Sequence, residues 1–137
     1  MKFTFNLVAL VVLSAALIEA KPHKRNIAQF GAMISIATGR SPFDYNNYGC
    51  FCGVGGQGTP IDGVDRCCQA HDSCYTAATA SGCNTYLDFY HFTSKDKTIT
   101  CDSSQNDACE QSICNCDKVA VECFAKNIYR KKHKGKC

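Results

Sequence analysis

The apolar residues within positions 26–38 recur at the spacing of one helix face. They stand three or four residues apart: Ile27, Phe30, Ile34 and Ala37. Such a pattern is typical of an amphipathic helix packed on one side, and Gly39 is its expected end. We therefore predict an N-terminal helix over residues 26–38.

Two longer stretches, residues 65–81 and 106–126, are predicted to be helices because both lack internal helix breakers. Between them, residues 86–90 and 97–101 are short β-prone runs around a polar turn, which predicts a small β-hairpin. Residues 41–63 are rich in Gly, Asn, Pro and Asp and are predicted to be loop. The pattern as a whole indicates a mainly α fold.

The first 20 residues are predicted to be a secretory signal peptide. A basic start precedes a largely apolar run over residues 7–18. The alternative is a transmembrane helix, which needs about 20 apolar residues, and Glu19 ends this run too early. Cleavage after Ala20 or after Ala16 fits the small-residue rule.

A short basic stretch, KPHKR at residues 21–25, follows the predicted signal peptide. Its Lys-Arg end is a common processing site, so we predict a pro-segment and one small mature domain over residues 26–137. A basic mature N-terminus is the alternative. The chain has 15 basic and 12 acidic residues and a formal net charge of +3. Four of these basic residues and one acidic residue lie in residues 1–25, which leaves 11 of each and no net charge.

All 12 cysteines lie between Cys50 and Cys137. An even cysteine count in a small secreted domain predicts a disulfide framework, and the oxidising compartment argues against a thiolate zinc site. The spacing alone leaves the pairing open, since this many cysteines allow on the order of 10⁴ connectivities.

The segment CCQAHDSCY, residues 67–75, crowds three cysteines around a His-Asp pair. On a helix, four of its side chains share one face: Cys67, His71, Cys74 and Tyr75. A further carboxylate, Asp117, stands beside two cysteines on the other long helix. If disulfides join the helices, His71 can meet Asp117, and a histidine held by a carboxylate is a general base. The alternative is ordinary helix packing. No Gly-x-Ser-x-Gly motif is present, so water would be the partner of such a base.

The segment YGCFCGVGGQGTP, residues 48–60, is rich in glycine. Gly53, Gly55 and Gly56 allow backbone carbonyls to converge on one point, as Ca²⁺ requires, and the Asp72 carboxylate would complete such a site. The pattern is neither an EF-hand nor a phosphate-binding Walker loop. A flexible loop pinned by its cysteines is the alternative.

Three segments together resemble signatures of the secreted phospholipase A2 family. YGCFCGVGG is similar to its calcium loop, DRCCQAHDSCY to its active-site helix, and ICNCDKVAVEC to its second signature. The resemblance covers residues 26–137 and is closest to the elapid-venom and pancreatic type. It implies a mainly α, disulfide-rich fold: an N-terminal helix, a calcium loop, two long antiparallel helices bridged by disulfides, and a small β-hairpin, the β-wing.

The resemblance also implies calcium-dependent hydrolysis of the sn-2 ester of glycerophospholipids to a lysophospholipid and a free fatty acid. His71 would deprotonate the attacking water. Asp117 would orient His71, supported by the hydroxyls of Tyr75 and Tyr90. The Gly53 backbone N–H, together with Ca²⁺, would stabilise the oxyanion.

For Ca²⁺, the resemblance implies ligands of two kinds: the Asp72 carboxylate, and the backbone carbonyls of Phe51, Gly53 and Gly55. It would also place three side chains of the first helix along the acyl channel: Ile27, Phe30 and Ile34. Plain helix-core packing is the alternative for these three.

Six disulfides are implied by the same resemblance: Cys50–Cys137, Cys52–Cys68, Cys67–Cys123, Cys74–Cys116, Cys83–Cys109 and Cys101–Cys114. A seventh bridge, usual in the pancreatic and elapid-venom type, is absent because its two positions are Ile36 and Ser94. The extra loop of pancreatic enzymes is also absent.

The expected partner is a phospholipid membrane surface or micelle. The basic tail RKKHKGK, residues 130–136, would contact anionic head groups; a solvated tail is the alternative. No nucleic-acid-binding motif accompanies the charge. Two other functions are weighed against the enzyme: a binding module that acts on a protein receptor without turnover, and a purely structural secreted protein. The intact His71, Asp72, Asp117 and glycine loop favour the enzyme. The sequence does not set the oligomeric state.

Overall fold

The computed structural model describes residues 25–137, so the predicted signal peptide and most of the predicted pro-segment lie outside the described residues. The elements follow in this order: α2 (Arg25–Thr38), α3 (Pro42–Tyr45), α4 (Gly63–Ala80), β1 (Phe92–Lys95), β2 (Thr98–Cys101), α5 (Ala108–Lys126) and the 3₁₀ helix η1 (Lys131–His133). This mainly helical architecture with one two-stranded sheet confirms the predicted fold class. None of the helices in this part of the chain has the length and apolarity needed to cross a membrane.

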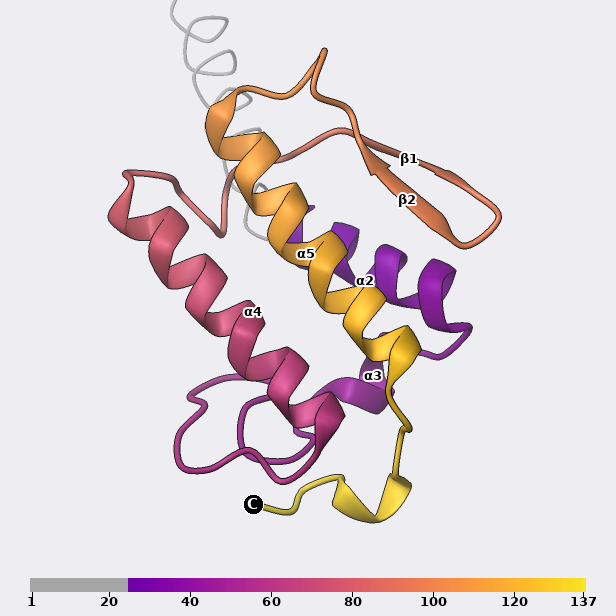
Figure 1. Cartoon of the computed structure of the whole chain (residues 1–137). Coiled ribbons are helices and arrows are strands. Elements are labelled where there is room, and N and C mark those ends of the chain that lie inside the picture. The colour runs from indigo at the N-terminus through magenta and orange to yellow at the C-terminus, as the bar shows by residue number, and fades with distance from the viewer. Residues whose placement is uncertain (1–24) are drawn as a thin grey trace, which may run out of the picture.

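Helices α4 and α5 form the centre of the fold. They run antiparallel and side by side, and α2 packs against α5 (Figure 1). Two disulfides join α4 to α5: Cys67–Cys123 and Cys74–Cys116. Side chains from the helices, the loop and the hairpin meet in one core, in which the largest fully buried ones include Tyr48, Tyr90, Met33, Ile99 and Ile113. The bridged pair thereby fixes how the inner face of α4 meets that of α5.

Both long helices begin where an aspartate caps the first turn. α4 begins at Gly63, two residues before the predicted start, because the Asp62 side chain accepts the N–H of Asp65 at 2.9 Å. α5 begins at Ala108, two residues after the predicted start, because Asp107 and Glu110 form a capping box. The predicted N-terminal helix agrees with α2 to within one residue.

The predicted loop over residues 41–63 contains a short helix, α3, which the sequence analysis missed. The Ser41 hydroxyl accepts the N–H of Phe43 at 3.3 Å and so caps this helix. Pro42 occupies the first helical position, where no N–H is needed. The glycine-rich segment lies in the remaining loop, between α3 and α4.

The first strand of the hairpin is Phe92–Lys95, not residues 86–90, so this part of the prediction is wrong. Asn84 accepts two backbone N–H groups through its side chain and folds the chain after it into a turn. The tight turn at Asp96, whose φ is 56°, sets which residues pair across the hairpin. The second strand, Thr98–Cys101, lies within one residue of its predicted start.

All six predicted disulfide pairings are confirmed, and residues 25–137 contain no free cysteine. Two bridges hold the glycine-rich loop: Cys52–Cys68 ties it to α4, and Cys50–Cys137 ties it to the C-terminal segment. Two more bridges lead to α5: Cys101–Cys114 attaches β2 to it, and Cys83–Cys109 attaches the segment that follows α4. The loop is therefore covalently held at both of its cysteines.

Candidate active site

His71 on α4 and Asp117 on α5 face each other across the bridged helix pair. His71 Nε2 lies 2.7 Å from Asp117 Oδ1. Asp117 is fully buried, whereas His71 keeps 13% of its side chain exposed. Because the carboxylate accepts a hydrogen bond, Nε2 carries the hydrogen, and the neutral imidazole has an unprotonated Nδ1. A histidine held in this way can accept a proton from a water molecule.

Two tyrosine hydroxyls complete the environment of the buried Asp117 carboxylate. The Tyr75 hydroxyl lies 2.7 Å from Oδ1, and the Tyr90 hydroxyl lies 2.6 Å from Oδ2. Burial raises the pKa of each phenol, and the charge of Asp117 raises it further. Both hydroxyls therefore stay protonated and donate to the carboxylate, which stabilises its charged form. The structure thus brings together four predicted site residues: His71, Tyr75, Tyr90 and Asp117.

The replacement Tyr90→Phe is expected to destabilise the fold by about 1–3 kcal/mol, because it leaves one oxygen of a buried carboxylate without its donor. Chemical denaturation with the disulfides intact measures this loss. Tyr86→Phe is the matched control, since the Tyr86 side chain is 67% exposed. Equal stability of the two variants would contradict a structural need for the Tyr90 hydroxyl.

Helix α2 supplies two contacts to this site that the sequence analysis missed. Asn26 is buried, and its Oδ1 lies 2.8 Å from the Tyr75 hydroxyl. Gln29 binds the backbone of Tyr90 through both ends of its amide, donating to the carbonyl at 2.5 Å and accepting the N–H at 3.2 Å. Both are polar residues on an amphipathic helix, and no spacing rule marks them as site residues.

The three predicted channel residues lie in different surroundings along α2. Ile27 is 64% exposed, and Ile34 lies in the core. Phe30, between them, is partly buried and stacks on His71, with ring centroids 4.4 Å apart and an angle of 7° between the planes. The series therefore runs from the surface to the core past the histidine ring. Contact with an acyl chain stays a prediction for all three.

The glycine-rich loop approaches α4 beside Asp72. Gly53 and Gly55 have φ values of 113° and 77°, in the region that glycine adopts readily and other residues rarely do. A Cβ on Gly56 would lie 2.8 Å from Asp72 Oδ2 and 2.8 Å from the Phe51 ring. A side chain at this position would therefore fill the space that the loop leaves beside the carboxylate.

The Asp72 carboxylate beside this loop fits a calcium ion. Burial raises the pKa of Asp72, and the neighbouring His71 partly offsets this effect. No hydrogen bond from residues 25–137 contributes to stabilising the Asp72 carboxylate. The same residues form no cluster of three His, Cys, Asp or Glu side chains suited to a metal, so backbone carbonyls would supply the other ligands. A partly buried carboxylate beside a glycine-rich loop, whose backbone can offer carbonyl oxygens, fits the hard oxygen environment that Ca²⁺ prefers.

The fold and this site define a class of protein: a small, disulfide-bridged helical domain with a histidine–aspartate pair next to a glycine-rich loop. The family model described as Phospholipase A2 matches residues 27–134 of the chain. The protein belongs to the phospholipase A2 family, which confirms the resemblance seen in the sequence.

Curated relatives from different animals support the same assignment. The chain is 45% identical over 136 residues to "Phospholipase A2" of Bos taurus, which covers 93% of this chain and 92% of that protein. It is 50% identical over 103 residues to "Phospholipase A2, membrane associated" of Mus musculus, with 74% and 70% covered. It is 46% identical over 112 residues to "Acidic phospholipase A2 PL-I" of Walterinnesia aegyptia, with 80% and 81% covered.

Proposed function

We propose that the protein is a secreted, calcium-dependent phospholipase A2, which hydrolyses the sn-2 ester of glycerophospholipids to a lysophospholipid and a free fatty acid. The observation that carries the proposal is the 2.7 Å contact between His71 and the buried Asp117. Membership of the family supports the class of reaction. The six disulfides fit an oxidising, extracellular compartment.

In this proposal His71 is the general base. Its Nδ1 takes a proton from a water molecule as the water oxygen bonds to the sn-2 carbonyl carbon, and the Asp117 carboxylate stabilises the imidazolium that forms. The bond between that carbon and the glycerol oxygen then breaks, and the imidazolium gives its proton to the departing oxygen. The Gly53 N–H donates a hydrogen bond to the oxyanion.

Four residues are proposed to hold calcium: Asp72 through its carboxylate, and Phe51, Gly53 and Gly55 through backbone carbonyls. When bound, Ca²⁺ supplies a Lewis acid for the substrate phosphate and for the negative charge that develops on the carbonyl oxygen. The Cys52–Cys68 disulfide ties the loop to the helix that bears Asp72, which supports a site built from both kinds of ligand.

The surroundings of the site are proposed to serve the lipid substrate and its membrane. Ile27, Phe30 and Ile34 would contact the acyl chain, and the basic tail at residues 130–136 would contact anionic head groups. Residues 1–20 are proposed to be removed as a signal peptide and residues 21–25 as a pro-segment, which leaves residues 26–137 as the mature enzyme.

Fatty-acid release from phospholipid vesicles tests this function. The form that comprises residues 26–137 is expected to cleave the sn-2 ester in the presence of Ca²⁺ and to lose this activity in chelator. Lipids with different acyl chains at sn-1 and sn-2 identify the ester that is cut. No cleavage by the correctly bridged, calcium-loaded protein would overturn the proposal and favour a binding module.

A further inference from the structure

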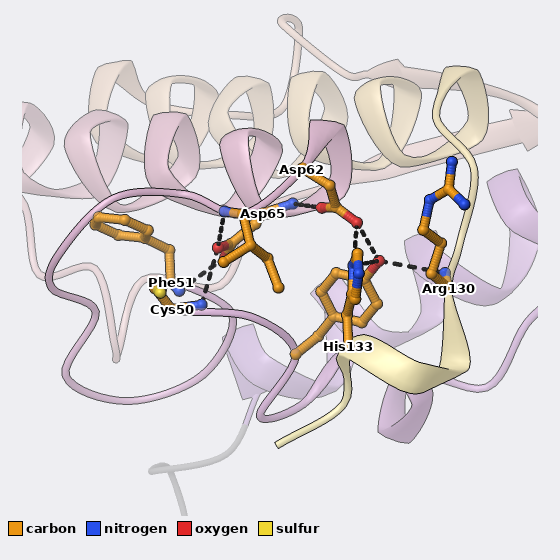
Figure 2. Close-up of polar contacts among 8 residues, drawn as sticks. Cys50, Phe51, Asp62, Asp65, Arg130 and His133 are labelled. Carbon is orange, nitrogen blue, oxygen red and sulfur yellow. Dashed lines mark hydrogen bonds and ion pairs between the residues drawn. The ribbon is translucent and has the colours of Figure 1, made fainter. Parts of the chain in front are cut away.

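Asp65 is a buried carboxylate to which the sequence analysis gave no role. It lies in the first turn of α4 and is 0% exposed. Its two oxygens accept three backbone N–H groups: those of Cys50 at 2.8 Å, Phe51 at 2.8 Å and Ile61 at 2.9 Å. Figure 2 shows the Asp65 side chain directed at the start of the glycine-rich loop. The carboxylate therefore connects the loop to the helix.

These hydrogen bonds meet the loop at a residue of the proposed calcium site. Phe51 donates its N–H to Asp65 and, in that site, gives its carbonyl to Ca²⁺. Asp65 and Asp72 stand seven residues apart on α4, which places them on one face of the helix, about two turns from each other. One helix face thus presents two carboxylates to the same loop. Asp65 accepts hydrogen bonds from the loop amides, and Asp72 is the proposed ligand of the calcium ion.

The backbone around Asp65 leaves this carboxylate little freedom. Gly49 has a φ of 57°, and a Cβ there would lie 2.4 Å from Asp65 Cγ. Hydrogen bonds from backbone N–H groups to a charged carboxylate are strong, and leaving a buried partner unpaired is costly. Asp65 therefore constrains the backbone at residues 50 and 51.

We propose that Asp65 is a positioning residue of the calcium site. By holding the N–H groups of Cys50 and Phe51, it fixes the Phe51 carbonyl relative to Asp72 before calcium binds, and so sets the affinity for Ca²⁺. This inference rests on the proposed function. Asp65 acts through the loop and does not touch the reacting atoms, so its replacement changes calcium affinity and leaves proton transfer by His71 intact.

A second aspartate at the start of α4, Asp62, offers a matched control. Its carboxylate accepts a hydrogen bond from the Tyr48 hydroxyl at 2.5 Å. It also lies 2.7 Å from His133 Nδ1 (Figure 2). Burial raises the pKa of Asp62, but the hydrogen bonds it accepts outweigh this effect and lower the pKa overall. Its other partner is the N–H of Asp65 in the first turn of α4, so none of these contacts is with the backbone N–H groups of Cys50 or Phe51.

Calorimetric titration with Ca²⁺ compares Asp65→Asn and Asp62→Asn. The first substitution keeps the shape of the side chain but turns an N–H toward the loop amides, so calcium affinity is expected to fall about 10–100-fold. The second is expected to leave calcium affinity unchanged. At saturating Ca²⁺, the kcat of Asp65→Asn is expected to return to that of the unchanged protein. Unaltered affinity in Asp65→Asn, or equal losses in both variants, would overturn the proposal.

Amide hydrogen exchange on the unchanged protein decides the matter if Asp65→Asn does not fold. The N–H groups of Cys50 and Phe51 are expected to be protected in chelator as well as in Ca²⁺, whereas those of residues 53–56 gain protection only with Ca²⁺. If Cys50 and Phe51 became protected only when Ca²⁺ is added, the metal would order this part of the loop and Asp65 would not be its positioning residue.

The proposed function and this inference fail in different ways. If the unchanged protein binds no Ca²⁺ in the calorimeter, both the proposed function and the inference about Asp65 are wrong. An unchanged protein that binds Ca²⁺ and hydrolyses lipid, together with an unaltered affinity in Asp65→Asn, would remove the inference alone.

Discussion

Replacement of His71 by glutamine is expected to lower kcat by about 10²–10⁴-fold, the usual contribution of a general base. Glutamine has an N–H for the Asp117 carboxylate, which His71 contacts at 2.7 Å, but it has no basic nitrogen that could take a proton from water. Steady-state fatty-acid release from vesicles at saturating Ca²⁺ measures this loss. Calcium affinity is expected to be unchanged, because the proposed ligands do not include His71.

The same substitution at a second histidine provides the control. His91 is exposed, and its ring packs on Phe89, so His91→Gln is expected to retain full activity. Similar activity in the two variants would contradict the assignment of His71 as the base. A biological effect that survives in His71→Gln would belong to binding and not to hydrolysis.

Asp72→Asn is expected to abolish measurable Ca²⁺ binding and to lower kcat/KM by about 10³-fold, which corresponds to the several kcal/mol that a Lewis-acid metal supplies. Asparagine keeps the size of the side chain but removes the one carboxylate among the proposed ligands. Since burial raises the pKa of Asp72, the neutral amide relieves an unfavourable charge. The variant in chelator is therefore expected to unfold at a temperature no lower than the unchanged protein. Calorimetry and thermal unfolding measure the two effects.

Asp96→Asn is the matched control for this substitution. Asp96 is exposed in the hairpin turn, and its φ of 56° is a conformation that asparagine tolerates. Calcium binding and hydrolysis are expected to be the same as in the unchanged protein. Calcium-dependent activity that persisted in Asp72→Asn would exclude this carboxylate as a ligand.

The three long helices could be predicted because their determinants are local, whereas the four-residue α3 was missed. Breakers and apolar spacing lie within each segment, and even the start of α5 was marked in the sequence by the capping-box residues Asp107 and Glu110. The first hairpin strand is different, because residues 86–90 and Phe92–Lys95 are both β-prone. The turn at Asp96 makes Phe92–Lys95 the strand that pairs. Residues 86–90 do not form the strand, and Tyr90 at their end is buried against Asp117 instead. That choice depends on tertiary structure.

The candidate site also contains residues that the sequence predicts and residues that it does not. His71 and Asp117 could be found because neighbouring cysteines mark the helix faces that are bridged. Asn26 contacts a tyrosine 49 positions away, and Gln29 contacts one 61 positions away. Such contacts arise only when α2 packs on the disulfide-bridged helices α4 and α5, so no local sequence pattern predicts them. The role of Asp65 is equally hidden, since its partners are backbone groups and have no side-chain signature.

The Cys50–Cys137 disulfide closes residues 50–137 into a covalent ring. A single cut anywhere inside this ring leaves both pieces in one molecule, with His71 and Asp117 still joined. Helix α2 lies outside the ring and contains no cysteine. One cut within residues 39–49 would therefore detach α2 from the covalent ring as a separate peptide. The contact of Phe30 with His71, and those of Asn26 and Gln29 with the two tyrosines, would then no longer be held within one covalent molecule.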